Sequence, residues 1–217
     1  QILIDQFALY TPDRSMVLEA PLTIRHLENP AQRTIKADIR NLRITPAGLK
    51  QLSEWTSNDK IPISPYLQAI GTLEVTGALS YRSQYLKSHL NLHTDLGSLA
   101  LFGSFAKGNE IEAEVHTPGF QLGKLTGREE QFGETAFDLS GKGLLRSGAY
   151  PVLSLQGTIG RLSYNHYDYH DITVDVDYRK GGFAGNVSIN DPHLALTTKG
   201  EFNLHSSTPY ILSLIHI

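Results

Sequence analysis

Apolar residues recur at every second position over most of the chain. The segment ITVDVDYR, residues 172–179, alternates apolar and polar side chains without a break. A period of two is that of a β-strand with one face in a core and the other in solvent. The same alternation occurs in LKSHLNLHT, GSLALFGSF, EIEAEVHT and ETAFDLSGKG, which start at residues 86, 97, 110 and 134. The pattern predicts roughly fifteen strands of ordinary length.

Turn residues separate these runs. RKGG at 179–182, NDPH at 190–193 and HSSTP at 205–209 combine glycine, proline, aspartate and asparagine, the residues typical of tight turns. Consecutive short strands joined in this way predict hairpins. The fold expected is all-β: an elongated, curled, antiparallel or mixed sheet, with one short helix.

The helix is predicted at about residues 46–56. In TPAGLKQLSEWTSND, Thr45 is a good N-cap and Pro46 stands at the first helical position. Leu49, Leu52 and Trp55 share one side of such a helix. The segment PISP, residues 62–65, forces a break after it.

The chain divides into an N-terminal β segment with this helix, residues 1–69, and a longer β segment, residues 70–211. A weak repeat joins GALSYRSQYLKSHLNL from Gly77 to GRLSYNHYDYHDITVDV from Gly160. The last six residues, LSLIHI at 212–217, can be back-translated to CTGTCTCTTATACACATC, which matches a transposase adapter used in sequencing libraries. We expect this end to be an adapter-derived artefact and assign it no function.

Composition narrows the function classes. The net charge of −3 provides no field that would attract nucleic acid, so no nucleic-acid partner is expected. Cysteine is absent, which excludes disulfides and thiolate chemistry. No apolar run approaches the roughly 18 residues that span a bilayer.

The densest cluster of chemically active side chains is LSYNHYDYHDITVDVDY, residues 162–178. His166, Asp168 and His170 fall on one side of a single extended strand, but positions spaced by two lie roughly 6 to 7 Å apart and rarely close on one ion. A rim strand is therefore favoured over a metal site. No nucleophile elbow, Walker loop or dinucleotide fingerprint occurs, and GKG at 141–143 is more typical of a turn or bulge. No enzymatic activity, metal or cofactor is expected.

The order of several motifs is specific. IGTLEVTGAL is followed by LNLHTDLGSLALFGSF, HTPGFQLGKLTG, LSGKG and a long segment from GTIGRLSYNHYDY to KGEFNL. From about Ile70 to Tyr210 the chain resembles the TamB family (translocation and assembly module) of the AsmA-like superfamily, in its Bacteroidetes-type form. TDLG, GFQLGKL, YNHYDY and NDPHLAL carry the resemblance.

The resemblance implies a segment of a long, taco-shaped β-groove in the periplasm of a Gram-negative bacterium. The full-length protein would be anchored in the inner membrane, reach the outer membrane, carry phospholipids and work with an Omp85-type outer-membrane partner. Lipids would diffuse along such a groove without any bond being made or broken, so the resemblance implies no catalytic residue.

The apolar positions of the alternation are the candidate groove-lining residues. A sheet with one bare apolar face must fold on itself, meet a second sheet or hold an apolar ligand. The candidates are Leu79, Tyr81, Leu90, Leu92, Leu99, Leu101, Ile111, Val115, Ile172, Val174, Val176, Phe183, Val187, Ile189, Leu194, Leu196, Phe202 and Leu204.

Other interpretations of the pattern remain open. The same residues would form the core of a closed β-sandwich. The chain would then be an extracellular binding module with tyrosine and histidine at its rim. A third interpretation is an assembly or chaperone module that offers a sheet edge to outer-membrane strands.

Overall fold

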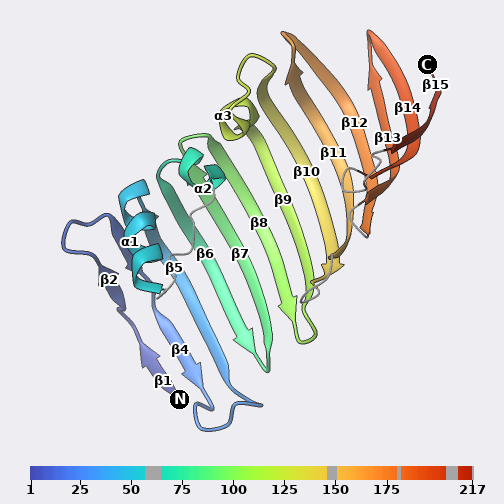
Figure 1. Ribbon diagram of the computed structural model, residues 1–217. Coiled ribbons are helices and arrows are strands. Elements are labelled where there is room, and N and C mark those ends of the chain that lie inside the picture. The colour runs from blue at the N-terminus through green and yellow to red at the C-terminus, as the bar shows by residue number, and fades with distance from the viewer. Residues whose placement is uncertain (57–64, 146–150, 180–181, 204–209, 217) are drawn as a thin grey trace.

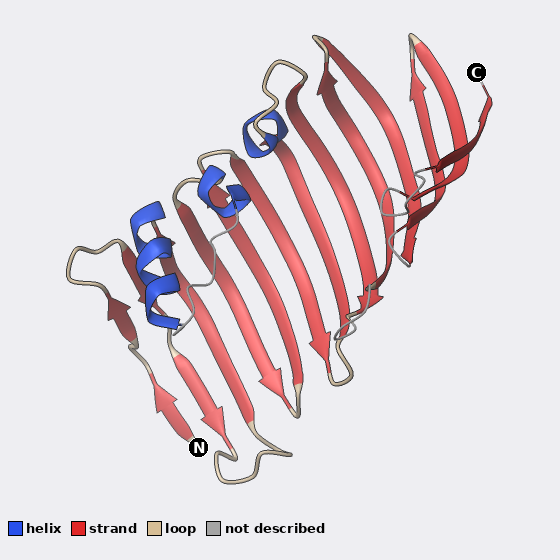
Figure 2. Ribbon diagram, in the orientation of Figure 1, coloured by secondary structure: helices blue, strands red, loops and turns tan. Residues whose placement is uncertain are grey.

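A computed structural model describes residues 1–56, 65–145, 151–179, 182–203 and 210–216. These residues form a single 15-stranded sheet with three short helices along one end of the strands (Figures 1 and 2). The first strands are β1 (Ile2–Ile4), β2 (Ala8–Tyr10), β3 (Met16–Glu19), β4 (Leu22–Arg25), β5 (Thr34–Ile44), β6 (Leu73–Arg82), β7 (Tyr85–Thr94) and β8 (Gly97–Ala106). Those that follow are β9 (Glu110–Gln121), β10 (Phe132–Leu144), β11 (Val152–Tyr164), β12 (Tyr167–Arg179), β13 (Gly182–Asp191), β14 (Leu194–Asn203) and β15 (Tyr210–His216). The helices are α1 (Pro46–Thr56), α2 (Pro65–Ala69) and α3 (Leu122–Thr126).

The sheet is a meander in which each strand from β5 onwards pairs with the next one along the chain. Every pairing is antiparallel, so the all-β fold is confirmed and the sheet is not mixed. At the N-terminal side β3 and β4 lie end to end against β5, because the chain bends at Ala20 and Pro21. In turn β2 pairs with β3, and β1 pairs with β4.

Helix α1 begins as the sequence predicts. The Gly48 N–H donates to Thr45 Oγ1 at 3.3 Å, which is the hydrogen bond of an N-cap. The helix packs against the β2–β3 turn, where Gln51 Nε2 donates to Asp13 Oδ2 at 2.9 Å. The side chain of Trp55 and residues 62–64 of PISP lie outside the described part of the chain.

Helices α2 and α3 were not predicted, and both stand beside α1 at the same end of the strands, here called the helical rim (Figure 1). The TDLG segment makes the β7–β8 turn there, and its Asp95 N–H donates to the Ile70 carbonyl after α2 at 3.1 Å. The GFQLGKL segment forms the end of β9 and α3, and the Gln121 N–H donates to the Leu96 carbonyl at 2.8 Å. These bonds bring the connections together over buried Leu96 and Phe120.

The stretch at 162–178 is a hairpin, and its prediction as one strand was wrong. Strand β11 ends at Tyr164, and Asn165 and His166 turn the chain with φ of 48° and 66° before β12 begins at Tyr167. Two consecutive positive φ angles are the mark of a type I′ hairpin turn. His166 therefore does not share a strand face with Asp168 and His170. The β6–β7 hairpin of the weak repeat turns in the same way at Ser83 and Gln84, with φ of 50° and 68°, one residue later than the repeat alignment would place the turn.

The prediction of a turn or bulge at GKG was also wrong. Residues 141–143 lie inside β10, where Gly141 pairs with Ala113 of β9 and Leu155 of β11. NDPH closes the β13–β14 hairpin as predicted, whereas residues 180–181 of RKGG and all of HSSTP lie outside the described residues.

Residues 212–216 form part of β15 and pair with β14 from Thr197 to Glu201.

Among the described residues, no helix has both the length and the apolar character needed to cross a membrane.

Candidate functional site

The strand register divides the side chains between two faces. Residues directly opposite each other on antiparallel strands point to the same side of the sheet. Leu90 pairs with Gly77 and Leu101, and Leu101 pairs with Val115, so one side can be followed from strand to strand. We call this side the apolar face.

The predicted lining residues all take apolar-face positions wherever the structure describes them. Ile172 is buried, and the other candidates whose side chains the structure describes are half-buried. Phe202 holds this register by pairing with Phe183, and Leu204 lies outside the described residues. The residues placed on the face are Leu79, Tyr81, Leu90, Leu92, Leu99, Leu101, Ile111, Val115, Ile172, Val174, Val176, Phe183, Val187, Ile189, Leu194, Leu196 and Phe202.

The opposite side, here called the polar face, carries the cross-strand ion pairs. Arg43 Nε lies 3.5 Å from Glu74 Oε1, directly across the β5–β6 pair. His116 faces Asp138 across β9 and β10, and Arg161 reaches Glu134. These groups are about half exposed, so each pair contributes little to stability. Their effect is to make this face hydrophilic, so that it stays in contact with solvent.

Burial along the apolar face falls away from the helical rim. Val75 and Phe120 stand near the rim and are only 5% and 6% exposed. Towards the other end of the strands, Leu86, Phe105 and Leu155 are 38%, 39% and 37% exposed. In the described residues the sheet is a single layer, and its helices stand only at the rim (Figure 2). The apolar face is therefore uncovered at the end of the strands away from the helical rim.

Small residues run across the middle of this uncovered surface. Ser88, Gly103, Ala113 and Gly141 are successive register partners on β7, β8, β9 and β10. We call them the small-residue row. Larger apolar side chains flank it, namely Leu90, Leu101, Val115 and Leu139 on the rim side and Leu86, Phe105 and Ile111 on the other.

The row leads into a concavity of about 560 Å³ on β9 to β13. Its apolar lining residues are Ile111, Ala113, Gly141, Leu153, Leu155, Val176, Tyr178 and Phe183. The volume falls in the usual range of about 300–1,000 Å³ for small-molecule sites. Because Ala113 and Gly141 project so little, they form its floor. We call this feature the apolar concavity.

Two glycines next to the concavity allow the strands to approach closely. Gly157 and Gly185 have φ of 149° and 157°, and a Cβ on either would lie 2.1 Å from a carbonyl oxygen of the neighbouring strand. Side-chain-bearing residues do not tolerate this conformation, whereas glycine does. Both lie on the apolar face, opposite Val174 and Val176 respectively.

Several residues of the face were missed by sequence reasoning. They belong mainly to β10 and β11, and they include Leu139, Leu153, Leu155, Ile159 and Leu162. The segment VLSLQGTIG alternates as clearly as its neighbours, but glycine stands at the apolar position 157. Counting such glycines as members of the apolar face would have added these residues to the predicted lining.

Tyr167 and His170 of the β11–β12 hairpin form a structural cluster with Asp191 and His193 of the β13–β14 turn. Asp191, which is buried, accepts from the Tyr167 hydroxyl at 2.6 Å, from the His170 N–H at 3.0 Å and from the His193 N–H at 2.9 Å. The bond to Asp191, desolvation and nearby negative charge raise the pKa of Tyr167 to about 12. The Tyr167 hydroxyl and the two backbone donors lower the pKa of Asp191, against desolvation. The cluster ties β12 to the β13–β14 turn.

Within the described ranges, no three histidine, aspartate or glutamate side chains converge so that they could hold a metal ion.

Comparison of the chain with protein-family models, with curated proteins and with solved structures finds no significant match.

The substitution Gly141→Leu tests whether the apolar concavity accepts apolar ligands. A Cβ at this position would meet only the Ser154 carbonyl at 3.4 Å and Leu155 Cδ1 at 3.7 Å, so the strand should persist. The leucine side chain would fill the floor, and binding of the neutral dye N-phenyl-1-naphthylamine should weaken about tenfold. Fluorescence titration measures this. Gly160→Leu is the control, because Gly160 is exposed outside the concavity; equal weakening by both would contradict the assignment.

The substitution Tyr167→Phe tests the Asp191 cluster. The lowered pKa of Asp191 stabilises the fold above a carboxyl's unfolded pKa near 4, and this is lost as pH falls. The raised pKa of Tyr167 stabilises the fold below pH 10, and this is lost between about pH 10 and 12. The variant should melt earlier at neutral pH and lose the alkaline part of the pH dependence, as measured by circular dichroism.

Tyr169→Phe is the matched control, since Tyr169 packs on Tyr167 with ring centroids 4.7 Å apart. The same change in melting temperature for both variants, or an unchanged alkaline limb in Tyr167→Phe, would show that the hydrogen bond contributes nothing.

Proposed function

We propose that this chain is a segment of a periplasmic bridge between inner and outer membranes, whose apolar β-groove shields phospholipid acyl chains. The observation that carries the proposal is the uncovered part of the apolar face away from the helical rim, with the small-residue row leading into the apolar concavity. The proposal makes this surface a conduit and requires no catalytic residue.

Acyl chains suit such a surface because they are narrow and apolar along their whole length. Each CH₂ group that leaves water for an apolar surface contributes about 0.8 kcal/mol. The small-residue row leaves space between two lines of larger side chains, and a chain lying there would contact Leu101 and Val115 on one flank and Phe105 and Ile111 on the other. The headgroup would stay at the open side, in water.

The surface also suits movement along the sheet. No charged side chain stands in the small-residue row or in its flanking positions on β7 to β10. The row continues through Leu155 and Val176 to Gly185, which are successive register partners on β11, β12 and β13. A lipid that slides across strands therefore exchanges one apolar contact for another, without a polar barrier.

The resemblance of residues 70–210 to the TamB family supports this function and supplies its context. By that resemblance the whole protein is anchored in the inner membrane, works in the periplasm and meets an Omp85-type protein at the outer membrane. The sandwich interpretation receives no support, because the described strands form one sheet and leave no second sheet to close a core.

The substitution Val176→Asp tests the conduit. Val176 lines the apolar concavity, so a carboxylate there would oppose acyl chains. We expect phospholipid that co-purifies with the chain from a bacterial periplasm to fall about tenfold or more, as measured by native mass spectrometry with organic extraction. Thr173→Asp is the control, because it places the same charge on the polar face of the same strand.

The two variants separate a conduit from a core. A Val176→Asp variant that keeps its sheet by circular dichroism but loses lipid supports the proposal. A wild-type chain that carries no phospholipid, or equal lipid in both variants, would refute it.

A second candidate is the assembly module, and the exposed apolar residues of β1 favour it. Strand β1 pairs with β4, and its Ile2 and Leu3 are 43% and 61% exposed. Exposed edge strands can add a strand from another protein. A photo-crosslinker at Leu3 should then capture an unfolded outer-membrane protein, while the same group at Glu112 on the polar face should not. Capture of lipid alone at Leu3 would exclude this role.

A further inference from the structure

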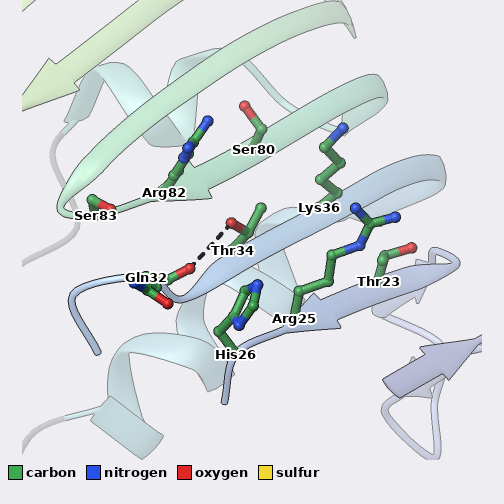
Figure 3. A pocket seen from close by; sticks show the side chains of 9 residues that line it. All are labelled: Thr23, Arg25, His26, Gln32, Thr34, Lys36, Ser80, Arg82 and Ser83. Carbon is green, nitrogen blue, oxygen red and sulfur yellow. Dashed lines mark hydrogen bonds between the residues drawn. The ribbon is translucent and has the colours of Figure 1, made fainter. Parts of the chain in front are cut away.

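The polar face holds a cavity of its own at the end of the strands away from the helical rim. It has a volume of about 490 Å³ and lies over β4, β5 and β6. Figure 3 shows the side chains of Arg25, Lys36 and Arg82 rising from these three neighbouring strands, with Thr34 between them. The cavity is on the opposite side of the sheet from the apolar concavity.

The register fixes the spacing of the three cations. Arg25 pairs with Thr34, and Thr34 pairs with Arg82, so the two arginines stand two strand spacings apart, or about 10 Å. Lys36 pairs with Ser80 in the next position along the same face. Long arginine side chains can bridge such a distance to a small anion held between them, over the Thr34 hydroxyl.

Among the described residues, these positive charges have no salt-bridge partner. The cavity lining contains no aspartate or glutamate. Arg43 and Arg179 on the same face each have a carboxylate partner. Like charges on adjacent strands repel one another, so an anion in this cavity would relieve an existing repulsion.

We propose that this cavity binds a phosphate group, either free or as the ester of a larger molecule. Arginine offers paired N–H donors that match two phosphate oxygens at once, and lysine adds a point charge. The Ser80 hydroxyl supplies a neutral donor beside the cations, whereas the Thr34 hydroxyl donates to the Gln32 carbonyl at 3.5 Å (Figure 3). The site is independent of the proposed acyl-chain conduit, because it uses only polar-face residues.

The variant Arg25→Gln/Arg82→Gln removes both arginines. Inorganic phosphate and glycerol 3-phosphate, titrated calorimetrically at low ionic strength, should bind the wild-type chain and bind this variant about tenfold more weakly or not at all. Phosphatidylcholine vesicles with and without phosphatidic acid, in a sedimentation assay, test the lipid headgroup as the source. The matched control, Arg179→Gln/Lys199→Gln, removes the same charge from β12 and β14.

The outcomes separate the two sources. Soluble phosphate binding that only the Arg25→Gln/Arg82→Gln variant loses supports a site for free phosphate esters. Binding only to vesicles with phosphatidic acid, with the same dependence on the variants, supports a headgroup site. No binding in either assay, or equal loss in both double variants, would overturn the proposal. Lys36→Gln replaces the first variant if its circular dichroism spectrum differs from wild type.

Discussion

The structure depends on one constraint: every strand has an apolar side, but a single-layer sheet provides nothing to bury it against. In a sandwich, a second sheet would cover these residues. Here three short helices cover only the ends of the strands, over residues such as Val75 and Phe120, and Leu86, Phe105 and Leu155 stay more than a third exposed. In folded proteins, large uncovered apolar surfaces are typical of binding sites. The fold and the proposed function therefore share one physical origin.

The glycines of the apolar face lower local stability, but they give this face a concave shape. Glycine in a strand interior gives up side-chain packing and backbone entropy. At Gly157 and Gly185 it permits a close approach between strands that a Cβ would block, and at Gly141 it leaves a floor between larger neighbours. A sequence selected only for a stable sheet would place branched residues at these positions. Because branched side chains are absent at these positions, the apolar face is hollow and not flat.

The alternation of apolar and polar residues was sufficient to predict the strands, because a period of two also assigns each side chain to a face. Ile172, Val174 and Val176 lie on the apolar face as predicted. Turns were harder to predict. Asn165 and His166 adopt positive φ without a glycine, and the polar run around them reads as a continuous strand. Helices α2 and α3 were missed because five residues are too few to show a helical period.

The site could be predicted only in part, because its shape depends on pairings between strands. The lining residues on β7, β8 and β9 follow from their own alternation. The small-residue row does not, because Gly103, Ala113 and Gly141 come from separate strands and become neighbours only through the register. The phosphate cavity has the same origin, since Arg25 and Arg82 are 57 positions apart in the chain and meet across Thr34. A single sequence does not specify register at that range.

A meander of this kind can also be extended by further strands without a change in the interactions that stabilise it. From β5 onwards each strand contacts the strands before and after it along the chain, so stability is close to a sum of local terms, as in repeat proteins. A globular core has a limited size, whereas this sheet can be lengthened by one hairpin at a time while the apolar face continues. The exposed ion pairs of the polar face add little to stability, but charged residues of this kind would keep one face of each added hairpin hydrophilic. The length of the sheet is therefore not limited by the size of a core. A conduit between two membranes requires this property, and a closed sandwich lacks it.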